Sequence, residues 1–191
     1  MRVIKRLVML FLVIVIVLAV AIIVYIRPAN ELDMNYEQVD MKTKVWNMVK
    51  TKVPEIELSE EELNNLAKKK IIEYLDTHDQ GVEITGTNFV IHDQELEVNL
   101  NGKWAIIPFG VTLDFHMEAS GSNLILEHKS TRIKQVTIPV SRFSLDPITF
   151  SLKEHVPDIV GIDQIHFKSN SMMLTFKIDW SIIPQFLLDF K

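Results

Sequence analysis

The chain opens with a long apolar run. Twenty consecutive uncharged residues lie between Leu7 and Ile26, and a helix of this length measures roughly 30 Å, the thickness of the hydrocarbon core of a bilayer. Arg2, Lys5 and Arg6 precede the run, whereas acidic residues follow it. The positive-inside rule therefore predicts a single-pass anchor over Leu7 to Ile26, with a cytoplasmic N-terminus and an extracytoplasmic remainder in the cell membrane.

A cleaved signal peptide is the alternative interpretation of this run. Ala19 and Ala21 form a small-x-small triplet after the apolar stretch, which is typical of a cleavage site. Cleavage there would leave Ile22 to Ile26 as an exposed apolar terminus. We therefore favour an uncleaved anchor.

A first helix is predicted after a polar stalk. Residues 28–40 are polar and acidic and show no period, as expected of a linker. From Met41 to Val53, apolar residues recur at helical spacing, and Asp40 and Pro54 are suited to begin and end the segment.

A second helix is specified in more detail by the stretch LSEEELNNLAKKKIIEYL. Ser59 and Glu62 can form a capping box, and Leu58 can pack on Leu63 as a hydrophobic staple. We expect Gly81 to close the end of this helix. The apolar residues of this helix form one stripe along it, consisting of Leu63, Leu66, Ala67, Ile71, Tyr74 and Leu75.

Strands dominate the rest of the chain. Alternation around Leu96 and Val98 predicts a strand that ends in a tight turn at Asn101 and Gly102. A long strand should follow, in which Trp104, Ile106 and Pro108 make the second face apolar as well. The phase of the next strand changes near Ser130, which predicts a bulge or bend there.

The last third of the domain combines a crossing segment with a hairpin. Asp146 and Pro147 predict a short helix that runs to about His155. Residues 162–168 and 172–178 read as a final hairpin, followed by an apolar tail.

Helices first and antiparallel strands afterwards predict an α+β domain, in which one or two helices pack in a curved sheet. The predicted organisation is a cytoplasmic tip and anchor over 1–27, a stalk over 28–40, the domain over 41–179 and the tail over 180–191. The apolar stripe of the second helix then has a sheet to face.

Charge and composition narrow the function. The exported part holds 16 basic and 25 acidic residues and so has a formal charge of −9, which disfavours nucleic acid as a partner because such binding depends on phosphate neutralisation. The chain has no cysteine. Disulfides, thiolate metal sites and a lipid-modified cysteine are therefore excluded.

Candidate chemistry is sparse. The sequence contains no nucleophile elbow, zinc-protease, phosphate-loop or dinucleotide motif. Asp114, His116 and Glu118 project from one face of a strand and could in principle hold a cation. The polar face of an amphipathic strand collects such residues anyway, and we expect neither a cofactor nor catalysis.

An apolar ligand site between helix and sheet is the main hypothesis. Closed core is the alternative for every one of these side chains, and Trp104 with Ile106 could equally be covered by the first helix or the tail. The candidate lining residues are Leu66, Ile71, Tyr74, Leu75, Trp104, Ile106, Phe109, Leu113 and Phe115.

Four segments carry a resemblance to a known family, namely LSEEELNNL (Leu58 to Leu66), GKWAIIPFGVTLDFHMEASGSNLILE (Gly102 to Glu127), VTIPV (Val136 to Val140) and HVPDIVGID (His155 to Asp163). With these segments the chain resembles the YpmS-like proteins, a family of single-pass membrane proteins of low-GC Gram-positive bacteria. The resemblance implies topology and fold but no activity, and the helix with a curled sheet is more remotely similar to tubular lipid-binding domains.

The expected function is therefore non-catalytic binding of an apolar or amphipathic molecule, such as an envelope lipid, by a membrane-tethered domain. The alternative is a module that binds a partner protein of the envelope through a sheet edge or the tail.

Overall fold

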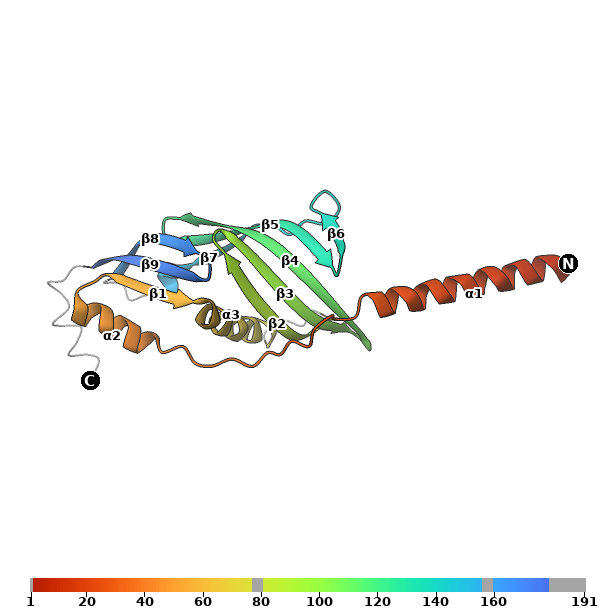
Figure 1. The fold of residues 1–191 in the computed structure, drawn as a ribbon, viewed down its shortest axis with the longest axis horizontal. Coiled ribbons are helices and arrows are strands. Elements are labelled where there is room, and N and C mark those ends of the chain that lie inside the picture. Colours follow the sequence, from red (N-terminus) through yellow and green to blue (C-terminus); the bar gives the residue numbers. More distant parts are fainter. Residues whose placement is uncertain (1, 77–80, 156–159, 179–191) are drawn as a thin grey trace.

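The structure is a computed structural model that describes residues 2–76, 81–155 and 160–178. Figure 1 shows a long N-terminal helix that projects from one end of a domain of short helices and curved antiparallel sheets. The predicted α+β class is confirmed. The predicted tail over 180–191 lies outside the described residues.

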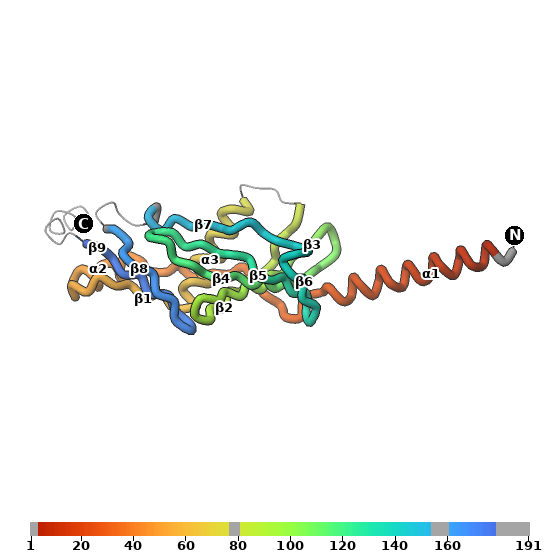
Figure 2. Tube along the Cα trace, turned by 90° about the horizontal axis from the view of Figure 1, so that it is seen from above, coloured from red at the N-terminus to blue at the C-terminus, as the bar shows by residue number. Residues whose placement is uncertain are grey.

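The N-terminal helix is α1 (Arg2–Tyr25). Its segment Ile4–Tyr25 has the length and composition of a membrane span, and no residue of its most apolar 18-residue stretch is buried in the protein. Figure 2 shows the helix extending away from the domain along its long axis.

The polar stretch after α1 has no helix or strand, yet it lies against the domain. It crosses three strands of the larger sheet before it reaches the next helix. The hydrogen bonds that dock it on these strands are Gly110 N to Ile26 O (2.9 Å), Asn101 Nδ2 to Asn30 O (2.8 Å) and Thr87 N to Asp33 O (3.2 Å).

The smaller sheet has the order β1 (Glu55–Ser59), β9 (Ser171–Ile178), β8 (Val160–Lys168). The predicted final hairpin is thus confirmed, whereas β1 was not foreseen. Helix α2 (Met41–Thr51) packs on this sheet through Met48, which is buried. Asp40 caps it as predicted by accepting a hydrogen bond from Thr43 N.

Helix α3 (Glu60–Leu75) has the predicted capping box between Ser59 and Glu62. Its C-cap is Asp76 and not Gly81, because the helix ends before that glycine. Leu58 and Leu63, the predicted staple pair, belong to one apolar cluster.

The larger sheet contains most of the remaining strands. Its order is β2 (Glu83–His92), β3 (Glu95–Trp104), β4 (Ile107–Ser120), β5 (Asn123–Ile133), β6 (Val136–Pro139), and β7 (Ile148–Ser151) pairs with β5. A register shift at Asp114 opposite Ser130 confirms the predicted bulge.

The predicted hairpin turn at Asn101 and Gly102 is wrong, since β3 continues through both residues to Trp104. The turn is formed by Ala105 and Ile106. Asn101 is used instead to bind the linker, and Gly102 makes room for Phe109, whose Cζ would lie 2.6 Å from a Cβ at position 102.

The short helix predicted from Asp146 to His155 is also wrong over most of its length. Ile148 to Ser151 form β7, which pairs with the start of β5, and only the 3₁₀ turn η1 (Leu152–His155) is helical. Tertiary pairing overrides the local cap signal here.

The core has two apolar clusters. One joins the small sheet to α2, and the other lies on the inner face of the large sheet, the face directed toward α3. Leu63 and Phe167 pack against both clusters and so connect them.

Candidate functional site

The inner face of strands β3 and β4 carries no polar side chain along its whole length. The register of β3 with β4 identifies the residues on this face, because every second cross-strand pair faces inward. The end of the sheet next to α1 is called the near end and the opposite end the far end. From far to near, the inward pairs are Leu96 with Phe115, Val98 with Leu113, Leu100 with Val111, Gly102 with Phe109 and Trp104 with Ile107.

Burial changes along this face. At the far end, Leu96, Val98 and Phe115 are buried in the second cluster. At the near end, Val111 and Phe109 are only half-buried, although they lie on the same strand and the same face as Phe115. The inner face is therefore closed at one end and open at the other. We call the near part, consisting of Leu100, Ile107, Phe109 and Val111, the open inner face.

The position of α3 explains this difference. In Figure 1, α3 lies below the far part of the sheet, and the β3–β4 hairpin extends beyond it toward α1. The open inner face runs along β4 from Val111 to Ile107, a length of about 13 Å.

Side-chain hydrogen bonds fix α3 at the far end of β2, the edge strand. Ile91 N donates to Glu60 Oε2 at 3.0 Å, and Phe89 N donates to Asn64 Oδ1 at 2.7 Å. Asn64 Nδ2 also donates to Phe89 O. These bonds satisfy backbone groups at the free edge of β2, and they determine which part of the sheet the helix covers.

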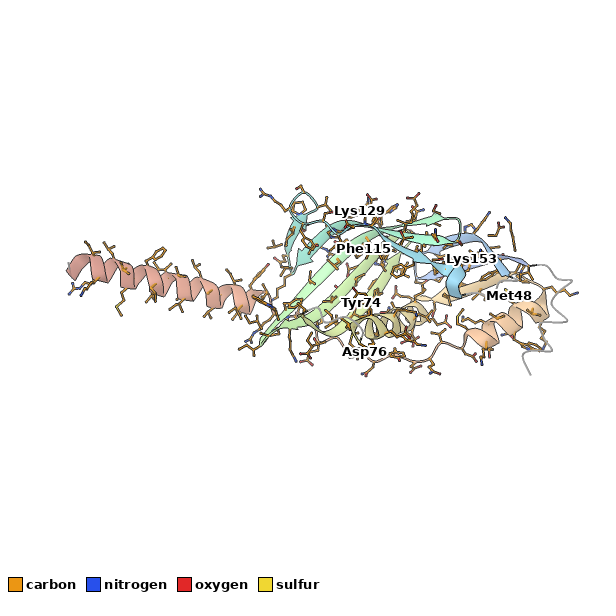
Figure 3. All side chains as sticks on the ribbon, turned by 180° about the vertical axis from the view of Figure 1, so that it is seen from behind. Met48, Tyr74, Asp76, Phe115, Lys129 and Lys153 are labelled. Carbon is orange, nitrogen blue, oxygen red and sulfur yellow. The ribbon has the colours of Figure 1, made fainter. Side chains whose placement is uncertain are left out.

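The structure separates the nine candidate lining residues into three groups. The first group belongs to the core: Phe115 is buried, Leu66 packs against the first cluster and Leu113 against the second. The second group is half-buried and consists of Ile71, Leu75 and Phe109. The third group is exposed and consists of Trp104, Ile106 and Tyr74; Tyr74 is 53% exposed and lies on the side of α3 that is directed toward the sheet in Figure 3.

Trp104 and Ile106 do not line a second face of β4 as predicted. Trp104 ends β3, and Ile106 is in the turn, where 92% of its side chain is exposed. The expectation rested on the misplaced turn, which put both residues on the following strand. Neither side chain is covered by α2, since that helix packs on the small sheet.

Leu100 and Val111 were not among the candidates, although they lie at the centre of the open inner face. Their alternation with Val98 and Leu113 was the available signal. The alternation shows which side chains share a face of the sheet, but it does not show which of them a helix covers.

The outer face of the sheet carries a polar network. Arg132 Nη2 lies 2.6 Å from both Asp114 Oδ1 and Glu97 Oε2. These hydrogen bonds raise the pKa of Arg132 further, and the bond from Arg132 lowers the pKa of Asp114 below its ordinary value. The network joins β3, β4 and β5 on the face opposite the apolar one.

Asp114, His116 and Glu118 do not form the cation site considered above. Asp114 is paired with Arg132, and His116 Nδ1 lies 2.9 Å from Glu95 Oε1. Within residues 2–76, 81–155 and 160–178, no cluster of three or more His, Asp or Glu side chains could hold a metal ion. His116 and Glu118 instead line a cavity of about 310 Å³ between β4 and β8.

The segment between β6 and β7 covers the centre of the inner face at β5. His128 is buried there, and its Nδ1 accepts a hydrogen bond from Leu145 N at 3.3 Å. Its Nε2 therefore carries the hydrogen and donates to Thr131 Oγ1 at 2.9 Å. The rings of Phe115 and Phe143 pack on either side.

Comparisons of the chain with protein-family models, with curated proteins and with solved structures find no match. The resemblance to the YpmS-like proteins stays a prediction.

Proposed function

We propose that the protein is a single-pass membrane protein whose extracytoplasmic domain binds an apolar or amphipathic molecule, such as the acyl chain of an envelope lipid, on the open inner face. One observation carries the proposal. The apolar inner face is buried at its far end and half-open at its near end, beside the helix that has the composition of a membrane span.

The dimensions fit a lipid chain. The length of the open inner face, about 13 Å along β4, is close to the thickness of one leaflet of the hydrocarbon core, about 15 Å. Each methylene that an occupant removes from water contributes about 0.8 kcal/mol. An acyl chain is therefore a suitable ligand for a strip lined by Leu100, Phe109 and Val111.

The proposed role is non-catalytic. The charged groups of the large sheet around this region pair with one another. Lys103 pairs with Glu83 at the near end, and Arg132 pairs with Asp114 and Glu97 on the outer face. The inner face offers shape and apolar surface, which are what a lipid-binding site requires.

Crosslinking tests the ligand. A photoactivatable residue is placed at Val111, on the open inner face, and in a matched variant at Thr112, which follows it on the outer face. Both positions lie at the same height on β4, so their distance from the bilayer is nearly equal. In membranes, we expect lipid adducts by mass spectrometry at Val111 and few at Thr112. Equal lipid labelling at both positions, or none at either, refutes the proposal.

The topology is tested separately. The chain has no cysteine, so one introduced cysteine reports a single position. Ser120→Cys at the exposed end of β4 should react with a membrane-impermeant maleimide on intact cells. Reaction only after lysis would place the domain in the cytoplasm.

A partner-binding module is the second candidate, because β8 has no neighbour on its outer edge among the described strands. The cavity beside it is lined by His116 and His166. A register shift at Asp163 distorts this edge, however, and bulged edges are poor templates for strand addition. Crosslinks from Gln164 to one defined envelope protein would support this function.

A further inference from the structure

The turn between β3 and β4 presents apolar residues to the surroundings. Ile106 is 92% exposed and Trp104 65% exposed. Ala105 between them has a φ of 53°, in the left-handed region where glycine or asparagine is usual. Neither exposed side chain belongs to a core cluster, so packing within the domain does not explain them.

This turn lies beside the end of α1. Gly110 N on β4 donates to Ile26 O, one residue beyond the helix, at 2.9 Å. The hairpin continues from the pair Asn101 with Gly110 to the pair Trp104 with Ile107, a distance of about 10 Å. Figure 1 shows that this hairpin reaches further toward α1 than other parts of the domain.

A second turn lies next to the same helix end. Lys134, in the turn between β5 and β6, places its Nζ 5.4 Å from the ring centroid of Tyr25. Val136, which follows this turn, is 52% exposed. Exposed apolar residues and a lysine thus surround the last turn of α1.

We propose that the β3–β4 turn inserts into the interfacial layer of the bilayer that α1 spans, with Trp104 and Ile106 as the inserted side chains. The inference rests on the proposed membrane anchoring. The position of the turn indicates the bilayer as its environment. The apolar residues of α1 extend to Tyr25, and a turn beside Tyr25 meets the same surroundings as the end of this helix. Trp is enriched at this depth of a bilayer, and a neighbouring lysine such as Lys134 can reach the headgroup phosphates.

Insertion would bring the open inner face to the membrane surface. Trp104 and Ile107 form the last inward pair of the same face on which Phe109 and Val111 lie. An acyl chain could then pass from the leaflet to the sheet along a continuous apolar path, without crossing water.

A depth measurement tests the inference on the full chain, reconstituted in phosphatidylcholine vesicles. An environment-sensitive fluorophore is attached to Ile106→Cys and quenched by lipids that carry spin labels on their acyl chains. The matched control is Ser120→Cys, an exposed site at the opposite end of β4. Because Ile106 makes so few contacts, the substitution should leave the fold unchanged. Val15→Cys in the middle of α1 reports the anchor itself.

We expect a blue-shifted emission at position 106 and lipid quenching several times stronger than at position 120. If position 15 is quenched by lipid but position 106 behaves like position 120, the insertion is refuted and the anchor stands. If position 15 is also unquenched, both proposals fail. A blue shift at position 106 without lipid quenching indicates a protein partner and likewise overturns the inference.

Discussion

Replacing Gly86 by alanine should release the linker from the domain. Gly86 is buried on β2, and a Cβ there would lie 2.1 Å from Leu32 O and 2.2 Å from Leu32 C. Both are backbone atoms, so no rotamer change relieves the contact. The linker itself must move by about 1 Å or more to restore van der Waals separation.

The expected loss of docking free energy follows from the hydrogen bonds that hold the linker on the sheet. Three hydrogen bonds join the linker to the large sheet, from Gly110, Asn101 and Thr87, and at about 1 kcal/mol each they contribute about 3 kcal/mol to its docking on the sheet. The released residues regain backbone freedom of about 1–2 kcal/mol each, so the free energy of global unfolding should change much less than docking does. Locally, a loss of about 3 kcal/mol corresponds to a roughly hundredfold larger population of the open form.

Amide hydrogen exchange on the full chain in detergent micelles measures this opening. The amides of Gly110 and Thr87 should exchange roughly a hundred times faster in Gly86→Ala. Gly161→Ala is the matched control in β8, because its Cβ would meet Lys177 Cβ at an ordinary 3.7 Å. Unchanged protection of both amides in Gly86→Ala would refute the assigned docking of the linker.

Three further predictions concern stability. Phe115→Ala should lower the free energy of unfolding by about 3–5 kcal/mol in urea titrations, and Phe109→Ala by clearly less, because Phe109 is only half-buried; equal losses would contradict the open inner face. The hydrogen bond from Arg132 lowers the pKa of Asp114 in the folded protein. The stabilisation by this pair is therefore present above the ordinary carboxyl pKa and is lost as the pH falls through the lowered folded pKa. Arg132→Met should make the free energy of unfolding depend less on pH on the acid side, and an unchanged pH dependence would show that this pair does not contribute to it. Ser59→Ala should cost about 1 kcal/mol in thermal unfolding, whereas Ser59→Asp should cost little, and equal costs would mean that the cap is not the cause.

The helices were predictable because their signals are local. Asp40 caps α2 and Ser59 caps α3 within three residues of each helix start, so tertiary structure is not needed to identify them. The bulge near Ser130 was predictable for a similar reason, since a change of phase along one strand reveals an extra residue.

The β3–β4 turn and the crossing segment were not predictable because distant residues decide them. Asn101 and Gly102 have the composition of a hairpin turn, yet Asn30, far away in the sequence, binds the first of them. Asp146 and Pro147 have the composition of a helix start, yet the segment after them pairs with β5. In both places a long-range contact outweighs a local preference of about 1 kcal/mol.

The open inner face shows where sequence reasoning about a site ends. Phe109 and Phe115 lie three inward positions apart on one strand, and the alternating pattern treats them alike. The pattern leaves undecided which end of the strand a helix covers. Glu60 and Asn64 decide that, because their hydrogen bonds to Ile91 and Phe89 attach the start of α3 to the far end of β2. The uncovered end therefore lies beside α1, and two polar side chains, rather than the apolar ones that would contact a ligand, determine where the proposed site is.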